Sequence, residues 1–169
     1  MRSIVLFLTA SATLVLAACG MGESGEITTE DGETVSYDID SEGDGESTVR
    51  ISGEDGEAIA RTGSNVKADL PDGWSVYPGA NVVSVMNMNS DDNTGMTVMM
   101  ETNAAPDKIM AHYRKQAEAA GLEIELEMNS AGNTMLAGSD DNDRNFSISV
   151  LGDPGDDQVA NLMLSGFEK

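Results

Sequence analysis

The sequence predicts an α+β fold in which one helix packs on one face of an antiparallel sheet. The expected order is β-β-α-β-β-β-β, preceded by an acidic β-hairpin region. Short segments of alternating apolar and polar residues recur along the chain, as in strands with one buried face. Only the segment 106–120 has helical spacing. The 169 residues include 18 glycines and only 4% aromatics, which favours short strands joined by many turns.

The N-terminal residues are predicted to be a signal peptide and not part of this fold. Arg2 is followed by an apolar run over 4–15, which is too short to span a bilayer and suits a signal-peptide core. The run ends in Leu16-Ala17-Ala18-Cys19, which resembles the lipobox of bacterial lipoproteins. That resemblance implies cleavage before Cys19 and acylation of its thiol. The alternatives are an ordinary secretory signal with a chance cysteine, or a buried structural thiol.

Cys19 is the only cysteine in the chain, so it has no disulfide partner, which supports the lipid attachment. Gly20 follows it where enterobacterial lipoproteins retained in the inner membrane have Asp, and the resemblance therefore favours the outer membrane, with the body in the periplasm. We expect four regions: a signal peptide (1–18), a lipidated tether (19–25), an acidic β-hairpin region (26–69) and an α+β domain (70–169).

The acidic region contains an internal repeat. The segment 27–35 recurs as 51–59, and each copy holds an Asp-Gly pair between short alternating segments, which is a strong hairpin signal. Val35, Tyr37 and Ile39 are expected to share one strand face, as are Val49 and Ile51 on the next strand. Two hairpins alone would be marginal, so they either form a small meander or extend the main sheet.

The charge of the chain limits its partners. There are 30 acidic and 9 basic residues, giving a formal net charge of -21. A polyanion would be repelled, so nucleic acid is not an expected ligand. The acidic surface would suit a basic envelope protein, or it would keep the domain soluble and away from anionic membrane surfaces.

The region from residue 70 supplies the elements of the predicted domain. A hairpin is expected from strands over 82–88 and 96–100, with Val82, Ser84, Met86 and Met88 on one face. Pro106 suits the first turn of the helix and Gly121 its C-terminal stop. The remaining strands are expected over 122–128 and near 134–138, 145–151 and 159–167.

This half also resembles small periplasmic domains of uncharacterised bacterial lipoproteins. The shared features are a Tyr-Pro-Gly-Ala element before a hairpin, then a helix that bears a Tyr and ends in Gly, then a run of strands. The matching residues here are 77–80, Tyr113 and Gly121, whereas Ala105 stands where a Ser or Thr cap is expected before Pro106. The resemblance implies a fold and an envelope location, and it implies no activity.

Catalytic residues are scarce. His112 is the only histidine, and helical spacing puts it on the polar face beside Lys108 and Gln116. There is no Gly-x-Ser-x-Gly elbow, no phosphate-cradling glycine loop and no His-Glu-x-x-His motif. We therefore expect no catalytic residues and no cofactor.

Two patterns could bind metals, although neither is assigned as a site. Five of the 11 methionines lie on the predicted hairpin, and thioether sulfur is a soft ligand for Cu(I). The favoured interpretation is core packing under the helix, with Met86, Met88, Met96 and Met100 on one face. The turn 40–45 begins like a calcium-binding loop, but Ile51 occupies the position that needs a Glu. The acidic turns 91–93 and 140–143 are shorter, and all three are interpreted as solvated hairpin turns.

The sequence thus predicts a lipid-anchored periplasmic protein without catalytic chemistry, acting as a structural or protein-interaction module. The alternative is a lipoprotein that binds a small ligand or a metal, Cu or Ca. The placement of the hairpin methionines distinguishes these two functions. Methionines exposed around a cleft favour ligand or metal binding, whereas methionines buried under the helix favour the interaction module.

Overall fold

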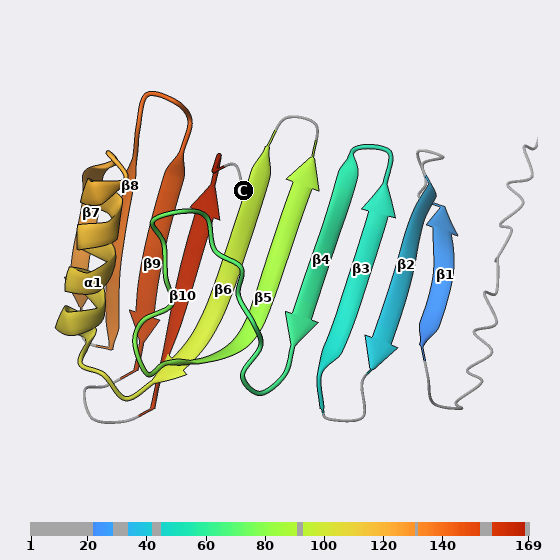
Figure 1. The fold of residues 1–169 in the computed structure, drawn as a ribbon, viewed down its shortest axis with the longest axis horizontal. Coiled ribbons are helices and arrows are strands. Elements are labelled where there is room, and N and C mark those ends of the chain that lie inside the picture. The colour runs from blue at the N-terminus through green and yellow to red at the C-terminus, as the bar shows by residue number, and fades with distance from the viewer. Residues whose placement is uncertain are drawn as a thin grey trace, which may run out of the picture.

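The computed structural model describes residues 22–28, 34–41, 45–90, 93–130, 132–152 and 157–167. Ten strands lie side by side in one antiparallel sheet, with a single helix in front of one end (Figure 1). Cys19, the turn residues Glu42 and Asp44, and residues 91 and 92 lie outside the described residues. Expectations that rest on them are untouched by the structure.

The strands and the helix follow one another in the order given by their bounds: β1 (Glu23–Thr28), β2 (Thr34–Ser41), β3 (Ser47–Gly53), β4 (Gly56–Thr62), β5 (Asn81–Ser90), β6 (Thr94–Thr102), α1 (Pro106–Ala119), β7 (Glu123–Ser130), β8 (Asn133–Ser139), β9 (Asn145–Leu151) and β10 (Gln158–Ser165). In space the strand order is β1-β2-β3-β4-β5-β6-β10-β9-β8-β7. The last strand is therefore inserted between β6 and β9.

The predicted α+β class is wrong. The acidic hairpins are not a separate region in front of a smaller sheet, because β4 pairs with β5 from Gly56 opposite Ser90 to Thr62 opposite Ser84. The result is one sheet of ten strands with a single 14-residue helix, a mostly β arrangement. Of the two possibilities left open for the hairpins, extension of the main sheet is the one observed.

The junction between β4 and β5 explains one glycine. Gly56 has φ of 145°, and a Cβ placed on it would collide with the carbonyl oxygen of Asn89 in β5. Only glycine combines that backbone angle with such a close approach of the neighbouring strand. Gly56 therefore allows the acidic hairpins to pair with the rest of the sheet.

The helix begins and ends where the sequence predicts. Pro106 occupies its first turn, and Ala105 provides no side-chain cap. At the other end Gly121 has φ of 83°, and the N–H of Leu122 donates to the carbonyl of Ala117 at 2.9 Å. This is the hydrogen-bonding pattern of a Schellman C-cap, which requires a residue that tolerates positive φ.

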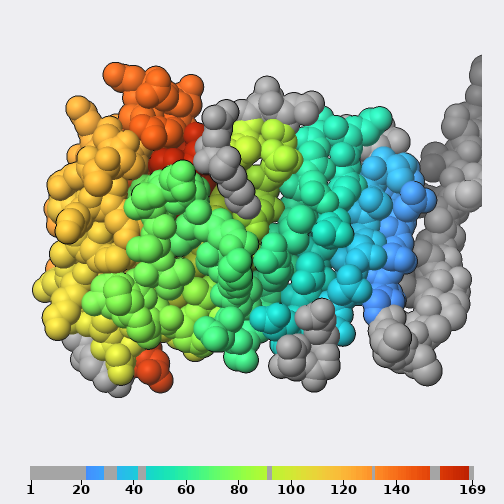
Figure 2. Space-filling model, viewed as in Figure 1, coloured from blue at the N-terminus to red at the C-terminus, as the bar shows by residue number. Residues whose placement is uncertain are grey.

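The buried core lies on one side of β5–β10. The helix covers β7, β8 and β9, and the connection over residues 63–80 covers the neighbouring strands (Figures 1 and 2). Trp74 of this connection packs against Phe146 and Phe167, with ring centroids 5.5 and 5.6 Å apart. Among the described residues the fully buried hydrophobic side chains begin at Val66.

The four N-terminal strands form a wing that carries no second layer. We use "wing" for β1–β4, residues 23–62. Among the described elements the wing strands contact only one another and β5, and every described wing residue is exposed or half-buried. A sheet normally buries at least one face against another layer, so the wing is an incomplete architecture by itself.

Candidate functional site

One side of the sheet collects the exposed apolar residues of the molecule. In an antiparallel sheet, residues directly opposite one another point to the same side, and neighbours along a strand alternate. The pairing register therefore assigns each paired residue to the side that carries the helix or to the other side, which we call the open face. One complete row of the open face crosses all ten strands: Glu23, Ile39, Val49, Ala60, Met86, Thr97, Met163, Ser147, Ala137 and Leu126.

The parallel rows of this face contain the remaining exposed large hydrophobic residues. Ile51 lies opposite Ala58, and Ala58 lies opposite Met88. Among the described residues, the large hydrophobic side chains that are 38% to 59% exposed number nine, and all lie on the open face: Ile27, Ile51, Met86, Met88, Met99, Leu126, Met128, Leu151 and Met163. A set of exposed apolar residues on one face differs from the scattered ones that any protein surface carries.

The open face is also almost free of charge. Of its paired positions only Glu23, Glu101 and Glu123 are charged, and each lies at or next to the end of a strand. The other side of the wing, by contrast, carries Asp38 opposite Arg50 and Glu57 opposite Ser52. The acidic residues of the strands are therefore concentrated away from the open face. Apolar residues without charges are typical of the centre of an interface.

A shallow hollow of about 170 Å³ lies near the middle of the open face, between Met88 and Met163. Gly95 forms part of its floor, because a Cβ there would meet the Met88 methyl carbon at 3.4 Å. At the edge of the wing, the ring of Tyr37 lies across Gly25 of β1, within 2.8 Å of where its Cβ would stand. Large flexible side chains beside small ones give this face relief into which a partner's side chains can fit.

The predicted placement of the methionines is half wrong. Met96 and Met100 are buried in the core on the helix side of the sheet, but Met86 and Met88 lie on the open face. The reason is an irregularity between Val82 and Ser84, which breaks the alternation in β5. The methionines of this hairpin are therefore divided between the two sides of the sheet.

The Tyr-Pro-Gly-Ala element joins the covering connection to the helix. Ala80 donates its N–H to the carbonyl of Tyr77 at 3.0 Å, and Gly79 has φ of 83°, as a tight turn with glycine at its third position requires. The Tyr77 N–H donates to the hydroxyl of Tyr113 at 3.2 Å, and that hydroxyl donates to the sulfur of Met100 at 3.4 Å. Burial raises the pKa of Tyr113 to about 12. This junction is structural.

His112 is half-buried at the same junction, not exposed on the polar face of the helix. Its Nε2 lies 2.7 Å from the side-chain nitrogen of Gln116, and its ring contacts that of Tyr77 edge-on at 5.3 Å. Gln116 also bonds both the N–H and the hydroxyl of Ser75, at 3.0 and 2.8 Å. His112 therefore helps to fix the connection over residues 63–80 on the helix.

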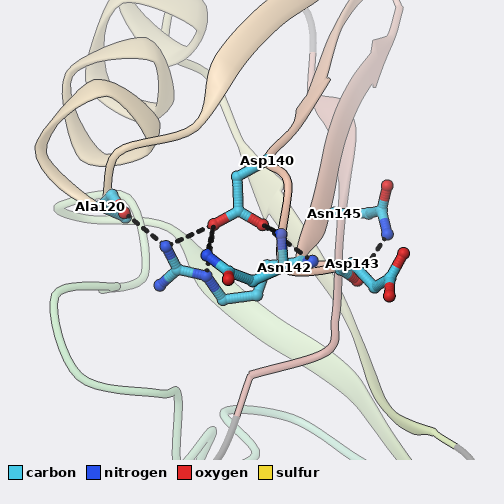
Figure 3. A network of polar contacts seen from close by, with 6 residues as sticks. Ala120, Asp140, Asn142, Asp143 and Asn145 are labelled. Atoms are coloured by element: carbon cyan, nitrogen blue, oxygen red, sulfur yellow. Dashed lines mark hydrogen bonds and ion pairs between the residues drawn. The ribbon is translucent and has the colours of Figure 1, made fainter.

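A second polar junction holds the helix C-terminus to the β8–β9 turn (Figure 3). Arg144 makes two hydrogen bonds to a single Asp140 oxygen, at 2.8 and 2.6 Å, and donates to the carbonyl of Ala120 at 3.0 Å. The Arg144 guanidinium lowers the pKa of Asp140 to about 2, assisted by the backbone N–H of Asn142. The predicted acidic turn 140–143 is thus built around an ion pair, which leaves Asp140 occupied by Arg144.

Two further features concern metals and other cavities. No group of three or more His, Cys, Asp or Glu side chains in the described segments is placed to hold a metal ion. On the helix side, an apolar hollow of about 260 Å³ is lined by Pro71, Asn87, Met96, Leu164 and Phe167, among others. It lies between β5, β6 and β10, Pro71 in the covering connection and Phe167 beyond β10.

Comparison with known proteins gives one similarity. Residues 82–158, which run from β5 to the first residue of β10, match a family model described as START domain-like. The match covers less than half of the chain. No curated protein and no solved structure matches the sequence. Within the described parts of the chain, none of the helices has the length and hydropathy needed to cross a membrane.

The sequence reasoning missed the open face, although a signal for it is present. In β10 apolar residues occur on both sides, with Ala160, Leu162 and Leu164 in the core and Val159 and Met163 on the open face. A nearly continuous apolar run is typical of a strand covered on both sides, whereas a half-buried strand alternates. Reading β10 in this way would have predicted a second apolar face.

Proposed function

We propose that this protein is a non-catalytic binding module of the cell envelope that is anchored by a lipid on Cys19 and binds a protein partner through the open face. The observation that carries the proposal is the collection of nine exposed large hydrophobic residues on one nearly uncharged side of the sheet. Water-soluble surfaces rarely keep an apolar face of this extent uncovered.

The size of the face favours a macromolecule over a small ligand. Ten strands about 4.8 Å apart and about eight residues long span roughly 43 by 25 Å, or on the order of 1,000 Å². A standard protein interface covers about 800 Å² on each partner. The hollow between Met88 and Met163, at about 170 Å³, is too small to account for the whole face by holding one ligand.

Site-specific photo-crosslinking in intact cells tests this function. A photoreactive amino acid at Met163, in the open face, is expected to capture a defined protein. The same amino acid at Lys115, on the exposed side of the helix, is the matched control and should not capture that protein. Equal capture at both positions, or none at Met163, would contradict the proposed interaction surface.

The lipid anchor has its own test. Each buried CH₂ of an acyl chain contributes about 0.8 kcal/mol to membrane binding, so several chains on Cys19 would hold the protein firmly. Cys19→Ser should leave the signal uncleaved or the protein absent from the outer-membrane fraction. If the variant is processed and fractionates like the wild type, the anchor is elsewhere or does not exist.

A second candidate function is the binding of a small apolar ligand, which the START domain-like match over residues 82–158 favours. The hollow of about 260 Å³ beside Leu164 and Phe167 is the site that would hold it. Native mass spectrometry of protein isolated from its own envelope should then show a bound mass. An Asn89→Trp variant, at an exposed residue that lines the hollow, should lose that mass while keeping the photo-crosslink at Met163.

A further inference from the structure

Resting on the proposed function, we infer that the partner at the open face is a second copy of this chain. The two sheets stack face to face as a β-sandwich, and a twofold axis runs parallel to the strands between β5 and β6. Four features lead to this arrangement: the bare wing, the area of the face, the distribution of charge and the position of the lipid anchor.

The wing needs a second layer. Its open side carries Val35, Tyr37, Ile39, Val49 and Ile51, and no described wing residue is fully buried. Two apolar sheet faces bury one another when they pack about 10 Å apart, with strand directions within about 30°. A second open face would therefore supply a layer that the described part of the chain does not provide.

The area of the open face and its division into two equal halves are consistent with a twofold-symmetric dimer. A face on the order of 1,000 Å² exceeds the roughly 800 Å² per partner of a standard stable interface. Homodimers are most often related by a twofold axis, which uses the same patch on both copies. An axis at the centre of the face divides the ten strands into five and five, with Met86 in β5 and Thr97 in β6 beside it.

The twofold operation places the bare half of one copy on the other half of its mate. A strand near the β1 edge then lies over the region near the β7 edge of the second chain. Along the row that crosses all ten strands, Ile39 and Val49 of the wing would lie over Ala137 and Ser147 of the mate, and Glu23 would lie over Leu126. Both sets are exposed or half-buried in the single chain, and both would be removed from water together.

The charge of the protein allows the two open faces to meet and predicts how dimerisation depends on salt. Each chain carries a formal net charge of -21, so two copies repel at long range. The open face itself holds only the carboxylates Glu23, Glu101 and Glu123 at or next to strand ends, and these need not meet at the centre. Salt screens the repulsion between the two chains, so self-association should tighten as salt is raised. Binding to a basic partner would weaken instead.

The lipid anchor selects the direction of the axis. Cys19 precedes Glu23, the first residue of β1, by only a few residues. An axis parallel to the strands keeps the strand directions of the two copies the same, so both β1 strands begin at the same end of the sandwich. Both lipids can then enter one membrane. An axis across the strands would place the two lipids at opposite ends.

The mass of the intact, detergent-solubilised protein tests the inference first. Sedimentation should give twice the chain mass, and the dimer should strengthen at higher salt. Ile51→Glu and Met163→Glu, at side chains that are 44% and 49% exposed, should convert it to monomer without unfolding, which circular dichroism would verify. Thr34→Glu adds the same charge to the opposite side of the wing and should leave the dimer intact.

Cysteine crosslinking tests the axis. Met86→Cys lies about half a strand spacing from the axis, which puts it roughly 11 Å from its mate across sheets about 10 Å apart. Ile27→Cys lies on the same face but in β1, about 43 Å from its mate, given strand spacings of about 4.8 Å. A short bis-maleimide should therefore link Met86→Cys to itself and leave Ile27→Cys unlinked. The wild type, with only Cys19, is the background control.

The outcomes separate this inference from the proposed function. A monomer at all concentrations and salts overturns the dimer, and a different protein captured at Met163 would then leave the proposed function standing. A dimer that Ile51→Glu and Met163→Glu do not affect, or equal linking of Ile27→Cys and Met86→Cys, overturns the face-to-face arrangement. If Met163 captures nothing and the protein is a monomer, both proposals fail.

Discussion

The two halves of the sheet are built from similar strands but are held together differently. Strands β5–β10 bury a core under the helix and the connection over residues 63–80, whereas β1–β4 are held mainly by pairing with their neighbours. Hydrogen bonding between strands defines the path of the chain, but burial of apolar side chains supplies most of the stability. The comparison teaches that one continuous sheet can contain a stable half and a half that depends on its surroundings.

The largest difference between the halves should come from truncating an aliphatic side chain in each. Leu162→Ala in β10 removes a fully buried residue and should lower the free energy of unfolding by about 3 kcal/mol. Ile59→Ala in β4 removes a half-buried residue on the helix side of the wing, outside the proposed interface, and should cost about 1 kcal/mol. Urea denaturation measures both. Equal losses would mean that the wing has a core of its own.

The link between the halves can be broken at Gly56. Gly56→Ala forces a Cβ against the Asn89 carbonyl at positive φ and should cost about 2–3 kcal/mol. Hydrogen exchange should show lost protection in β1–β4 and retained protection in β5–β10. Gly45→Ala is the control, because Gly45 also has positive φ but has open space around it. It measures the cost of backbone strain without the steric collision. A uniform loss of protection in both halves would contradict the division.

Tyr113 tests the covered half through pH. Tyr113→Phe leaves the Tyr77 N–H without its acceptor and should cost about 1–2 kcal/mol at neutral pH. The folded pKa of about 12 lies above the ordinary 10.0, so the stability linked to the neutral hydroxyl is complete below pH 10 and is lost as pH rises from 10 to 12. The difference between variant and wild type should therefore shrink across that range. A constant difference would show that the hydroxyl ionises normally.

Asp140 gives the complementary effect in acid. Its folded pKa of about 2 lies below the ordinary 3.8, so its contribution is complete above about pH 4 and is lost as pH falls toward 2. Between pH 4 and pH 2 the free energy of unfolding should therefore fall less for Asp140→Asn than for the wild type. Urea denaturation at several pH values in that range measures both. The wing should show no corresponding change, which hydrogen exchange at pH 3 would verify.

The smallest effect is expected at an ion pair of the wing. Arg50 and Glu57 approach to 3.0 Å, but their side chains are 50% and 43% exposed, and exposed pairs contribute about 0–1 kcal/mol. Arg50→Ala should change the urea midpoint little, and Glu57→Ala should behave alike. A large loss from either variant would mean that this side of the wing is covered after all.

Much of the local structure could be predicted from the sequence. The helix was recognised because Pro106 and Gly121 mark its ends, and the pairing of Val49 and Ile51 with Ile39 and Tyr37 confirms their shared face. These features depend on residues close together in the sequence, where propensity and periodicity apply.

The errors arise where distant strands meet. The fold class was wrong because the pairing of β4 with β5 depends on the close approach at Gly56, which periodicity does not report. The faces of Met86 and Met88 were wrong because an irregularity near Val82 shifts the alternation. His112 was placed on an exposed helix face because the connection that covers it comes from another part of the chain. The open face could not be predicted because it is formed only when strands that are distant in the sequence pair with one another.

The position of β10 has a consequence for biogenesis. Because β10 is the strand that pairs with both β6 and β9, the segments before it cannot join into one sheet until residues 158–165 have left the ribosome. Up to that moment the nascent chain holds two separate pieces, one ending with β6 and one formed by α1 and β7–β9. Folding of the covered half is therefore completed late, and a chain interrupted before Gln158 would expose the unpaired edges of both pieces to proteases and chaperones.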